Sequence, residues 1–368
     1  MNLTVEELVA LGLFDPGADD AAERINLLTL ALDHGASVEE IRLAMAQHRL
    51  HTLAGERVVL AATKRATLRE MAANAGADPE FVESLWRAFG FADPGAEPLA
   101  CSEGDEEVFA LFVVLAGLFG RDTALQIART AGASLARMAD AAIGALRARI
   151  EAPLRTQGAD DLEVARRFVA LATDLVPRLY PMIEAVHRRH LAQAGRRFTL
   201  WELPASETST VYAVIGFADL AGFTARIQEL APAELDALVR SFEDIVLGEL
   251  ALPGARLVKL IGDEAMFVAG TADDAALIAR GITRRVSDKD ELPPVKIGLA
   301  AGEVLVREGD VFGAAVNRAA RLVRIAQPNT VVVDSEVASR LNARATKHLG
   351  SQSVPGFDAP IDAFRLVS

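Results

Sequence analysis

Apolar residues in the first 190 positions of the chain recur at spacings of three and four, which is the period of an amphipathic helix. The pattern is clear over 25–32 and again over 164–175, where Ile, Leu, Val and Phe return to one helical face. Turns of the Asp-Pro-Gly type interrupt it at 15–17 and 93–95. We therefore expect residues 1–190 to form an all-helical domain.

The pattern changes near residue 195. A stretch of small and polar residues that ends at 204–209 is typical of a linker, which we place at 191–210. Beyond it, β-branched runs alternate with helical patterns. The expected strands are 211–215, 256–261, 265–269, 295–300 and 330–333, and the expected helices are 233–250, 273–286, 314–325 and 335–341. This interleaving predicts an α/β or α+β sheet domain over 211–368.

Composition limits the class of protein. A length of 368 residues fits two domains, and the single cysteine, Cys101, excludes an internal disulfide or a multi-cysteine metal site. The longest apolar run, Val108 to Phe119, is shorter than the roughly 20 residues that a membrane span needs. Because the chain starts directly in acidic, helix-like sequence, we expect no signal peptide, no membrane span and a cytoplasmic location.

The net charge argues against a nucleic-acid partner. It is −13 overall; residues 201–368 carry −6 (17 Lys and Arg against 23 Asp and Glu), which leaves −7 (21 against 28) for residues 1–200. Neither half has the basic excess that binding to a phosphate backbone requires. A phosphate ligand would therefore be held through metals and a few placed cations.

Two aspartates in the second domain are candidates for such a site. Asp219 ends an apolar strand, and Asp263 lies between two strand-like runs, at the tip of a predicted hairpin. If the two strands are neighbours, both carboxylates lie at one sheet edge, where they suit a pair of divalent metals. The turn after Asp219 has small residues and leads into a helix start, whose free backbone N–H groups can seat phosphate oxygens. The residues of this loop are Ala221, Gly222, Phe223 and Thr224.

Three sequence blocks together resemble the class III nucleotide cyclases. They are Phe217–Thr224 (FADLAGFT), Val258–Asp263 (VKLIGD) and Asp310–Arg321 (DVFGAAVNRAAR), and they occur in the order of that family. The resemblance spans 211–334, nearly the whole second domain. It implies a ferredoxin-like βαββαβ catalytic palm, so that the fold class expected for the whole chain is α+β, and an adenylate cyclase that forms 3′,5′-cyclic AMP and pyrophosphate.

The same resemblance implies a role for each site residue. Asp219 and Asp263 would hold two divalent ions, Mg²⁺ or Mn²⁺, which activate the ribose 3′-OH and clamp the triphosphate. Lys259 and Asp310 look like the pair that reads adenine, since guanylate cyclases of this family typically carry Glu and Cys or similar residues there. Asn317 and Arg321 look like the pair that orients the ribose and offsets the charge on the α-phosphate.

In this family the active site forms between two catalytic domains, with metals on one protomer and purine-reading residues on the other. This chain carries both sets, so the resemblance implies a homodimer with two equivalent sites.

The chain departs from the family at Pro355, where a Lys that contacts the triphosphate is common. The possible substitutes are Lys347, Arg365 or an Arg from the partner. Glu264, next to Asp263, is also unusual and is expected to face solvent or a metal's outer shell.

Two segments of the chain are similar to proteins with other functions. Gly262-Asp263-Glu264 is similar to the hairpin of diguanylate cyclases, although Ile261 stands where they need a second Gly. The predicted helix pair over 67–90 is similar to the start of MerR-like DNA-binding regulators. Residues 64–96 hold four Lys and Arg against five Asp and Glu, which is unfavourable for contacting phosphates, and we expect Trp86 in the core.

The N-terminal domain is expected to regulate the enzyme. A helical domain before a soluble cyclase domain resembles mycobacterial cyclases that are autoinhibited and respond to pH. The apolar run 108–115 should be buried as core, as a dimer interface or in a pocket for a lipid or other small ligand. His187 and His190 lie three apart beside cations on the helix that leads into the linker, so they are candidate pH-sensing residues.

Overall fold

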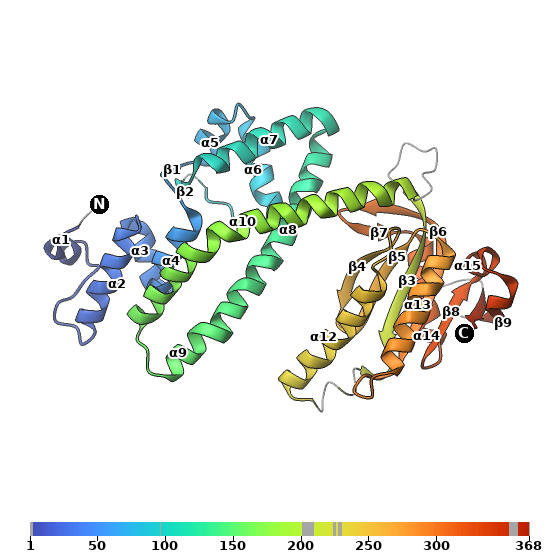
Figure 1. The fold of residues 1–368 in the computed structure, drawn as a ribbon. Helices are drawn as coiled ribbons and strands as arrows, with labels where there is room; N and C mark the ends of the chain where they lie inside the picture. Colours follow the sequence, from blue (N-terminus) through green and yellow to red (C-terminus); the bar gives the residue numbers. More distant parts are fainter. Residues whose placement is uncertain are drawn as a thin grey trace. The chain divides into compact units, whose positions relative to one another are not determined.

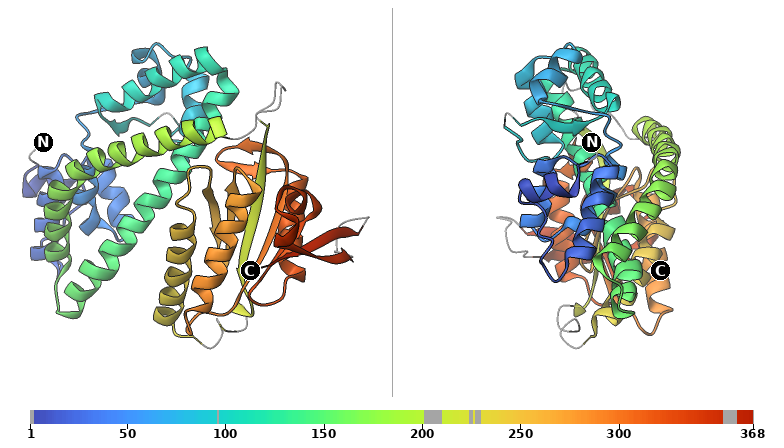
Figure 2. Two further views of the ribbon diagram at one scale, coloured as in Figure 1. Left: turned by 45° about the vertical axis from the view of Figure 1, so that its right-hand side comes forward. Right: turned by 90° about the vertical axis from the view of Figure 1, so that its left-hand side faces the viewer.

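The computed structural model describes residues 3–95, 97–200, 210–223, 226, 230–352 and 360–367. The chain forms two compact units, 1–186 and 187–368, and the fold is α+β overall (Figure 1). Helices form nearly all of the first unit, whereas the second combines one large sheet with helices. Two further views show the same elements from other sides (Figure 2).

The first unit is built from short helices and two long ones. Its helices are α1 (Val5–Ala10), α2 (Ala21–Asp33), α3 (Val38–Ala46), α4 (Leu50–Leu60), α5 (Leu68–Asn74), α6 (Pro79–Ala88), α7 (Glu103–Phe119), α8 (Arg121–Leu146), a π-turn (Arg147–Glu151) and α9 (Ala152–Thr156). Helix α10 (Asp161–Leu200) begins in this unit and continues past residue 186 into the second. The expectation of a wholly helical unit misses β1 (Lys64–Ala66) and β2 (Leu99–Cys101), which pair antiparallel. Three-residue strands are too short to show an alternating pattern.

Capping boxes define where several of these helices begin. The Thr67 hydroxyl accepts from the Glu70 N–H at 3.2 Å, and the Thr67 N–H donates to the Glu70 carboxylate at 2.7 Å. Thr4 with Glu7 and Ser37 with Glu40 repeat this arrangement. Each box satisfies donors that the first helical turn otherwise leaves open.

Within the single chain, α7 buries only part of the apolar run 108–115, and burial of the rest in a dimer interface stays a prediction. Phe109 and Phe112 enter the core, but Val108, Leu111 and Val114 are 41%, 55% and 57% exposed. The chain itself covers only one face of this apolar helix. Trp86, by contrast, packs against the same core, as expected, and donates its indole N–H to the Ala92 carbonyl at 2.7 Å.

The predicted linker begins too early. Helix α10 continues to Leu200, so residues 191–200 are helical. Most of the side chains described between 191 and 199 are exposed, and residues 201–209 lie outside the described part of the chain. Across the described residues, no helix has the length and hydropathy that crossing a membrane requires.

The second unit contains an eight-stranded sheet in the order β4-β5-β3-β6-β8-β10-β9, with β7 paired to β6. Its strands are β3 (Thr210–Leu220), β4 (Arg256–Ile261), β5 (Glu264–Ala269), β6 (Val295–Arg307), β7 (Asp310–Phe312), β8 (Thr330–Asp334), β9 (Thr346–Gln352) and β10 (Ile361–Leu366). Its helices are α12 (Pro232–Glu249), α13 (Ala272–Ser287), α14 (Ala314–Ile325), α15 (Ser335–Arg340) and a 3₁₀ turn (Ala343–Ala345).

Two apolar layers cover the two faces of this sheet. Helices α12, α13 and α15 pack on one face and α14 on the other. Side chains alternate along β3, so Phe217 and Ile215 face α14 while Ala218 and Leu220 face α13. Helix α14 lies very close to β6, because a Cβ added at Gly298 would come within 2.4 Å of the Ala319 carbonyl oxygen.

Candidate active site

The register of β3 and β5 brings the two candidate metal-binding aspartates together. Asp219 pairs with Glu264 across the strands, and Asp263 lies in the turn that joins β4 to β5. The Leu220 N–H donates to the Asp263 carbonyl at 3.4 Å, which closes this corner of the sheet. The expectation that the two strands are neighbours is therefore confirmed.

Electrostatics at this corner are unfavourable for the negative charges that it holds. Burial, and after it the charges of Asp263 and Glu264, together raise the pKa of Asp219 to about 6. Burial also raises the pKa of Asp263, and burial together with the Asp263 charge raises that of Glu264. Glu264 thus belongs to the cluster and is only partly exposed, contrary to a purely solvent-facing position.

This donor set fits a divalent cation. Carboxylate oxygens are the ligands that Mg²⁺ prefers, and a bound cation would offset the cost of holding these half-buried negative charges together. In the described ranges, no group of three or more His, Cys, Asp or Glu side chains has metal-binding geometry. Asp219 and Asp263 as metal ligands therefore stay a prediction.

A lysine that sequence reasoning missed lies beside this cluster. Lys296 on β6 is directly opposite Asp219 on β3, and its charge lowers the pKa of Asp219 against the other effects. Opposite residues of an antiparallel pair have Cβ atoms about 5 Å apart, so the two side chains share one face. No pattern in the sequence indicates that Lys296 lies opposite Asp219, because local periodicity does not show which strand pairs with β3.

The phosphate loop is partly as expected. The Ala221 N–H donates to the Pro294 carbonyl at 2.8 Å, so this amide is not available to a phosphate, and Ala221 has to be removed from the predicted set. Gly222 has a left-handed φ of 77°, and Phe223 is buried in the core. Their amides remain candidates, while Thr224 lies outside the described residues.

The two expected purine readers contact each other. The Lys259 ammonium on β4 lies 2.5 Å from the Asp310 carboxylate on β7, with 41% and 28% of the side chains exposed. Asp310 also accepts from the Val311 N–H at 2.9 Å. A contact between β4 and β7 thus joins residues 51 positions apart in the sequence.

Helix α14 carries Asn317 and Arg321 one turn apart. Asn317 is exposed and Arg321 is partly buried. Arg324, near the end of the helix, lowers the pKa of Glu264, so this end lies toward the carboxylate cluster. Asn317 lies seven residues earlier, about 10 Å back along the helix axis.

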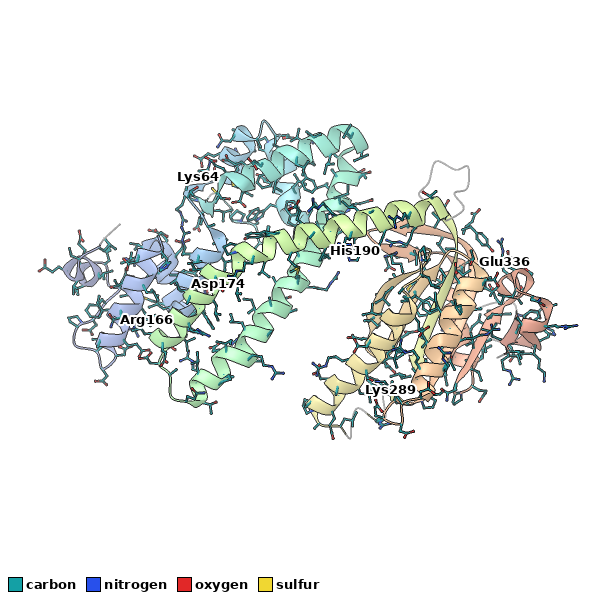
Figure 3. All side chains as sticks on the ribbon, in the orientation of Figure 1. Lys64, Arg166, Asp174, His190, Lys289 and Glu336 are labelled. Carbon is teal, nitrogen blue, oxygen red and sulfur yellow. The ribbon has the colours of Figure 1, made fainter. Side chains whose placement is uncertain are left out.

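The remaining predicted residues lie elsewhere. His187 and His190 are exposed on α10, where Figure 3 labels His190. Lys347 and Arg365 pair across β9 and β10, and β10 is three strands from β3. This register places neither beside Asp219. Pro355 lies outside the described residues.

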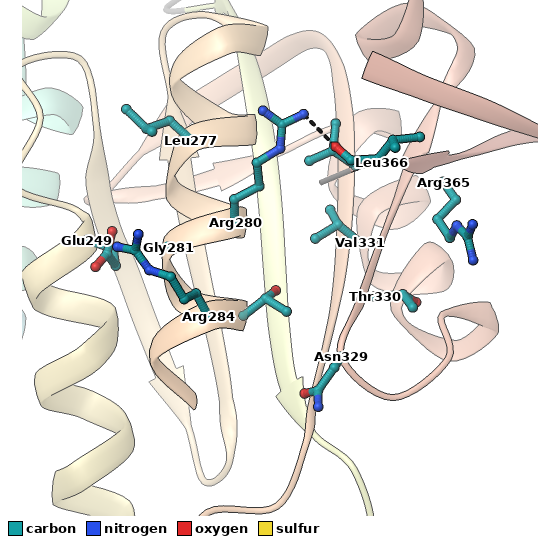
Figure 4. Close-up of a pocket in the computed structure, with 12 residues that line it drawn as sticks. Glu249, Leu277, Arg280, Gly281, Arg284, Asn329, Thr330, Val331, Arg365 and Leu366 are labelled. Carbon is teal, nitrogen blue, oxygen red and sulfur yellow. Dashed lines mark hydrogen bonds between the residues drawn. The ribbon is translucent and has the colours of Figure 1, made fainter. Parts of the chain in front are cut away.

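Two cavities are lined by residues other than Asp219 and Asp263. One, of about 700 Å³, is lined by Arg280, Arg284 and Arg365 among others, and Arg280 donates to the Val367 carbonyl at 2.7 Å (Figure 4). The other, of about 750 Å³, lies in the first unit and is lined by residues of α4, α8 and α10 with their neighbours. No residue of the run 108–115 lines this second cavity, so it is not the ligand pocket expected around that run.

Family models match both halves of the chain. Residues 4–194 match the adenylate cyclase regulatory domain, and residues 205–366 match the adenylate and guanylate cyclase catalytic domain. These matches favour the nucleotide cyclase interpretation over a diguanylate cyclase or a DNA-binding regulator.

Several relatives match this chain over most of its length. An uncharacterized protein of Mycobacterium tuberculosis is 34% identical over 99% of this chain and 94% of its own length. An adenylate cyclase of Streptomyces coelicolor is 36% identical over 78% of this chain and 74% of its own. A pH-sensitive adenylate cyclase of M. tuberculosis is 30% identical over 89% and 82%.

Among solved structures, the catalytic core of a rhodopsin-guanylyl cyclase with converted specificity, in complex with ATPαS, aligns with a TM-score of 0.41. It is 20% identical, and the alignment covers 44% of this chain and 99% of that core.

Proposed function

Because this chain belongs to the family of class III nucleotide cyclases, with an adenylate cyclase regulatory domain before the catalytic domain, we propose that it converts ATP to 3′,5′-cyclic AMP and pyrophosphate. The observation that carries the choice of ATP is the contact between Lys259 and Asp310. An ammonium can donate to adenine N1 while a carboxylate accepts from the 6-amino group. Guanine presents the opposite pattern at these two positions.

Asp219 and Asp263 would hold two Mg²⁺ or Mn²⁺ ions. When bound, these ions supply charge neutralisation for the triphosphate and a lower pKa for the ribose 3′-OH. The protein's own part is to keep the two carboxylates adjacent and half-buried, at the corner that β3 and the β4–β5 turn form.

The triphosphate needs further cations, and Lys296 supplies one. It lies opposite Asp219 in the sheet, so a phosphate held at the carboxylate cluster lies within reach of its ammonium group. We assign it the role that the family often gives to a Lys at the position of Pro355. The amides of Gly222 and Phe223 would bind phosphate oxygens beside it.

Asn317 and Arg321 would act on the ribose and the α-phosphate. An arginine placed at the α-phosphate stabilises the charge that develops there during the reaction, and Asn317 orients the sugar by hydrogen bonding. Arg321 lies within one turn of Arg324, whose charge acts on Glu264 of the same chain, but Asn317 lies about 10 Å along the helix from Arg324. This separation supports a site shared between two copies, in which the cluster of one chain meets α14 of the other.

The regulatory domain would set the activity of this dimer. Its match over 4–194 and the 30% identity to a protein named as a pH-sensitive adenylate cyclase support pH as a signal. Within this proposal, His187 and His190 are the residues that would carry a pH response.

The test is turnover by the purified full-length chain with Mn²⁺ or Mg²⁺. We expect cyclic AMP from ATP and little product from GTP. Chains carrying Asp219→Ala and chains carrying Arg321→Ala should each be inactive, and their mixture should regain about one working site per heterodimer. Absence of product from the mixture, with exchange of subunits verified, would contradict the shared site but not the ATP specificity.

A further inference from the structure

A buried ion pair connects α14 to the sheet. Arg318 on α14 donates from Nε to the Asp334 carboxylate at 3.1 Å and from Nη2 to the Ala301 carbonyl at 2.6 Å. The planar guanidinium thus joins two acceptors, one at the end of β8 and one on β6. Neither residue belongs to the site described above.

Asp334 is held from three sides. Besides Arg318, its carboxylate accepts from the Ala301 N–H at 3.3 Å and from the Val337 N–H at 2.9 Å, where it caps α15. Its side chain is 3% exposed, and within the described ranges it is the one buried residue with a polar or charged side chain. A buried carboxylate with these partners is geometrically constrained, because each lost contact leaves a desolvated charge.

The position of Arg318 on the helix gives this constraint a consequence. Successive residues of an α-helix turn by about 100°, so Arg318 lies about 100° from Asn317 and about 60° from Arg321 around the axis. Fixing Arg318 therefore fixes the rotation of α14 and the directions in which the two catalytic candidates project. The close approach at Gly298 fixes the distance of the helix from β6 but not its rotation.

We propose that Arg318 and Asp334 are positioning residues of the cyclase, which hold α14 in the rotation that Asn317 and Arg321 need in the transition state. This inference rests on the proposed function for its kinetic part. The structural part, that the pair holds the helix, stands on the contacts alone.

The first experiment replaces the planar guanidinium by a point charge. Arg318→Lys keeps a cation near Asp334 but cannot hold the carboxylate and the Ala301 carbonyl together. We expect kcat for ATP to fall about 10- to 100-fold, with KM changed less than about threefold, because misplacing a group that acts in the transition state costs turnover more than binding. Hydrogen exchange of residues 314–325 should accelerate, while that of α13 should not.

The matched control is Arg285→Lys, which alters an exposed pair with Glu249 on the same domain and should leave kcat and exchange unchanged. Asp334→Asn keeps one acceptor for the α15 cap and removes the charge, and we expect it to lower kcat in the same way. The double variant Arg318→Lys with Asp334→Asn should lose no more than the worse single variant, since both act through one contact.

Several results would overturn the proposal. Full kcat in a folded Arg318→Lys chain, or losses that multiply in the double variant, would show that the pair does not act as a unit on catalysis. If Arg318→Lys does not fold, Asp334→Asn decides by the same two measurements. If the unmodified chain makes no cyclic product, the proposed function fails, and unchanged exchange at 314–325 would then separately refute the structural part.

Discussion

Two groups of carboxylates, one in each unit, have pKa values that are shifted in opposite directions. In the first unit, the pKa of Glu7 and of Glu70 is lowered, chiefly by the backbone N–H of the residue that caps the same helix. In the second unit, burial raises the pKa of Asp219, Asp263 and Glu264, and neighbouring negative charge adds to the rise at Asp219 and Glu264. The first group has its donors within one helical turn, whereas the second has more negative charge than nearby donors.

These two groups of acids differ in what compensates their negative charge. A capping glutamate contributes to the fold and needs nothing from outside the chain. A cluster with raised pKa values lowers the stability of its own fold at neutral pH and becomes favourable only when a cation arrives. The contrast makes quantitative predictions about activity, stability and pH.

The largest effect should come from Asp219→Ala or Asp263→Ala. Each vacates a proposed metal site, so cyclic AMP formation should fall by about 10³-fold or more. In metal-free buffer the thermal midpoint should stay the same or rise, since one repelling charge is gone. Calorimetry and a product assay test both parts, with Asp236→Ala, on the exposed surface of α12, as the control. A markedly lower thermal midpoint in either variant would show that these carboxylates do not destabilise the metal-free fold.

A change of the purine readers should have the next largest effect. Lys259→Glu with Asp310→Cys removes both proposed hydrogen-bond partners of adenine, and ATP turnover should fall about 10- to 100-fold. Measuring ATP and GTP turnover side by side checks this. Unchanged use of ATP would remove the two residues from the purine site.

The pH dependence of stability should have opposite signs in the two units. The lowered pKa values of Glu7 and Glu70 give stability that is present above pH 4.5 and is lost as the pH falls through their folded values. The raised pKa of Asp219 gives stability that is present at low pH and is lost as the pH rises through about 6. Hydrogen exchange of both units between about pH 3 and pH 7, corrected for the intrinsic rate and without metal, should show the first unit losing stability below pH 4.5 and the second losing it toward pH 6; equal signs would contradict the comparison.

Removing one cap should have a smaller effect. Thr67→Ala deletes the hydroxyl that accepts from the Glu70 N–H, and we expect the first unit to lose about 1 kcal/mol of stability. Thr67→Ser keeps the acceptor and should be close to neutral. Denaturant unfolding monitored by hydrogen exchange of the first unit measures both variants.

The smallest effect concerns the histidines. If His187 and His190 carry a pH response, the full-length enzyme should be more active near pH 6 than near pH 8, and His187→Gln with His190→Gln should flatten that profile. Activity profiles of both proteins decide this. An unchanged profile would move the response elsewhere, with His34, His48 and His51 the next candidates.

Local periodicity was enough to predict much of the second unit. Helix 314–325 and strand 256–261 have the predicted bounds, because each carries a clear apolar repeat and ends at a turn residue. The pairing of Asp219 and Asp263 was predictable once their strands were assumed to be neighbours. In each case the information lay within about a dozen residues.

What sequence reasoning missed depends on contacts between distant segments. Lys296 became a candidate only when the register set it opposite Asp219, and Ala221 ceased to be one when its N–H was found to bond Pro294. The ion pair of Arg318 and Asp334 joins residues 16 positions apart through the fold of β8 against α14. No periodic pattern encodes such pairs.

The glycine at position 298 also limits how this enzyme can change over generations. A Cβ there would lie 2.4 Å from the Ala319 carbonyl oxygen and 2.6 Å from the Val323 nitrogen, both backbone atoms that no rotamer can move aside. Every missense change of a glycine codon adds at least a Cβ, so each one would push the helix that bears Asn317 away from the sheet. We therefore expect position 298 to accept no residue other than glycine unless α14 is displaced from the sheet.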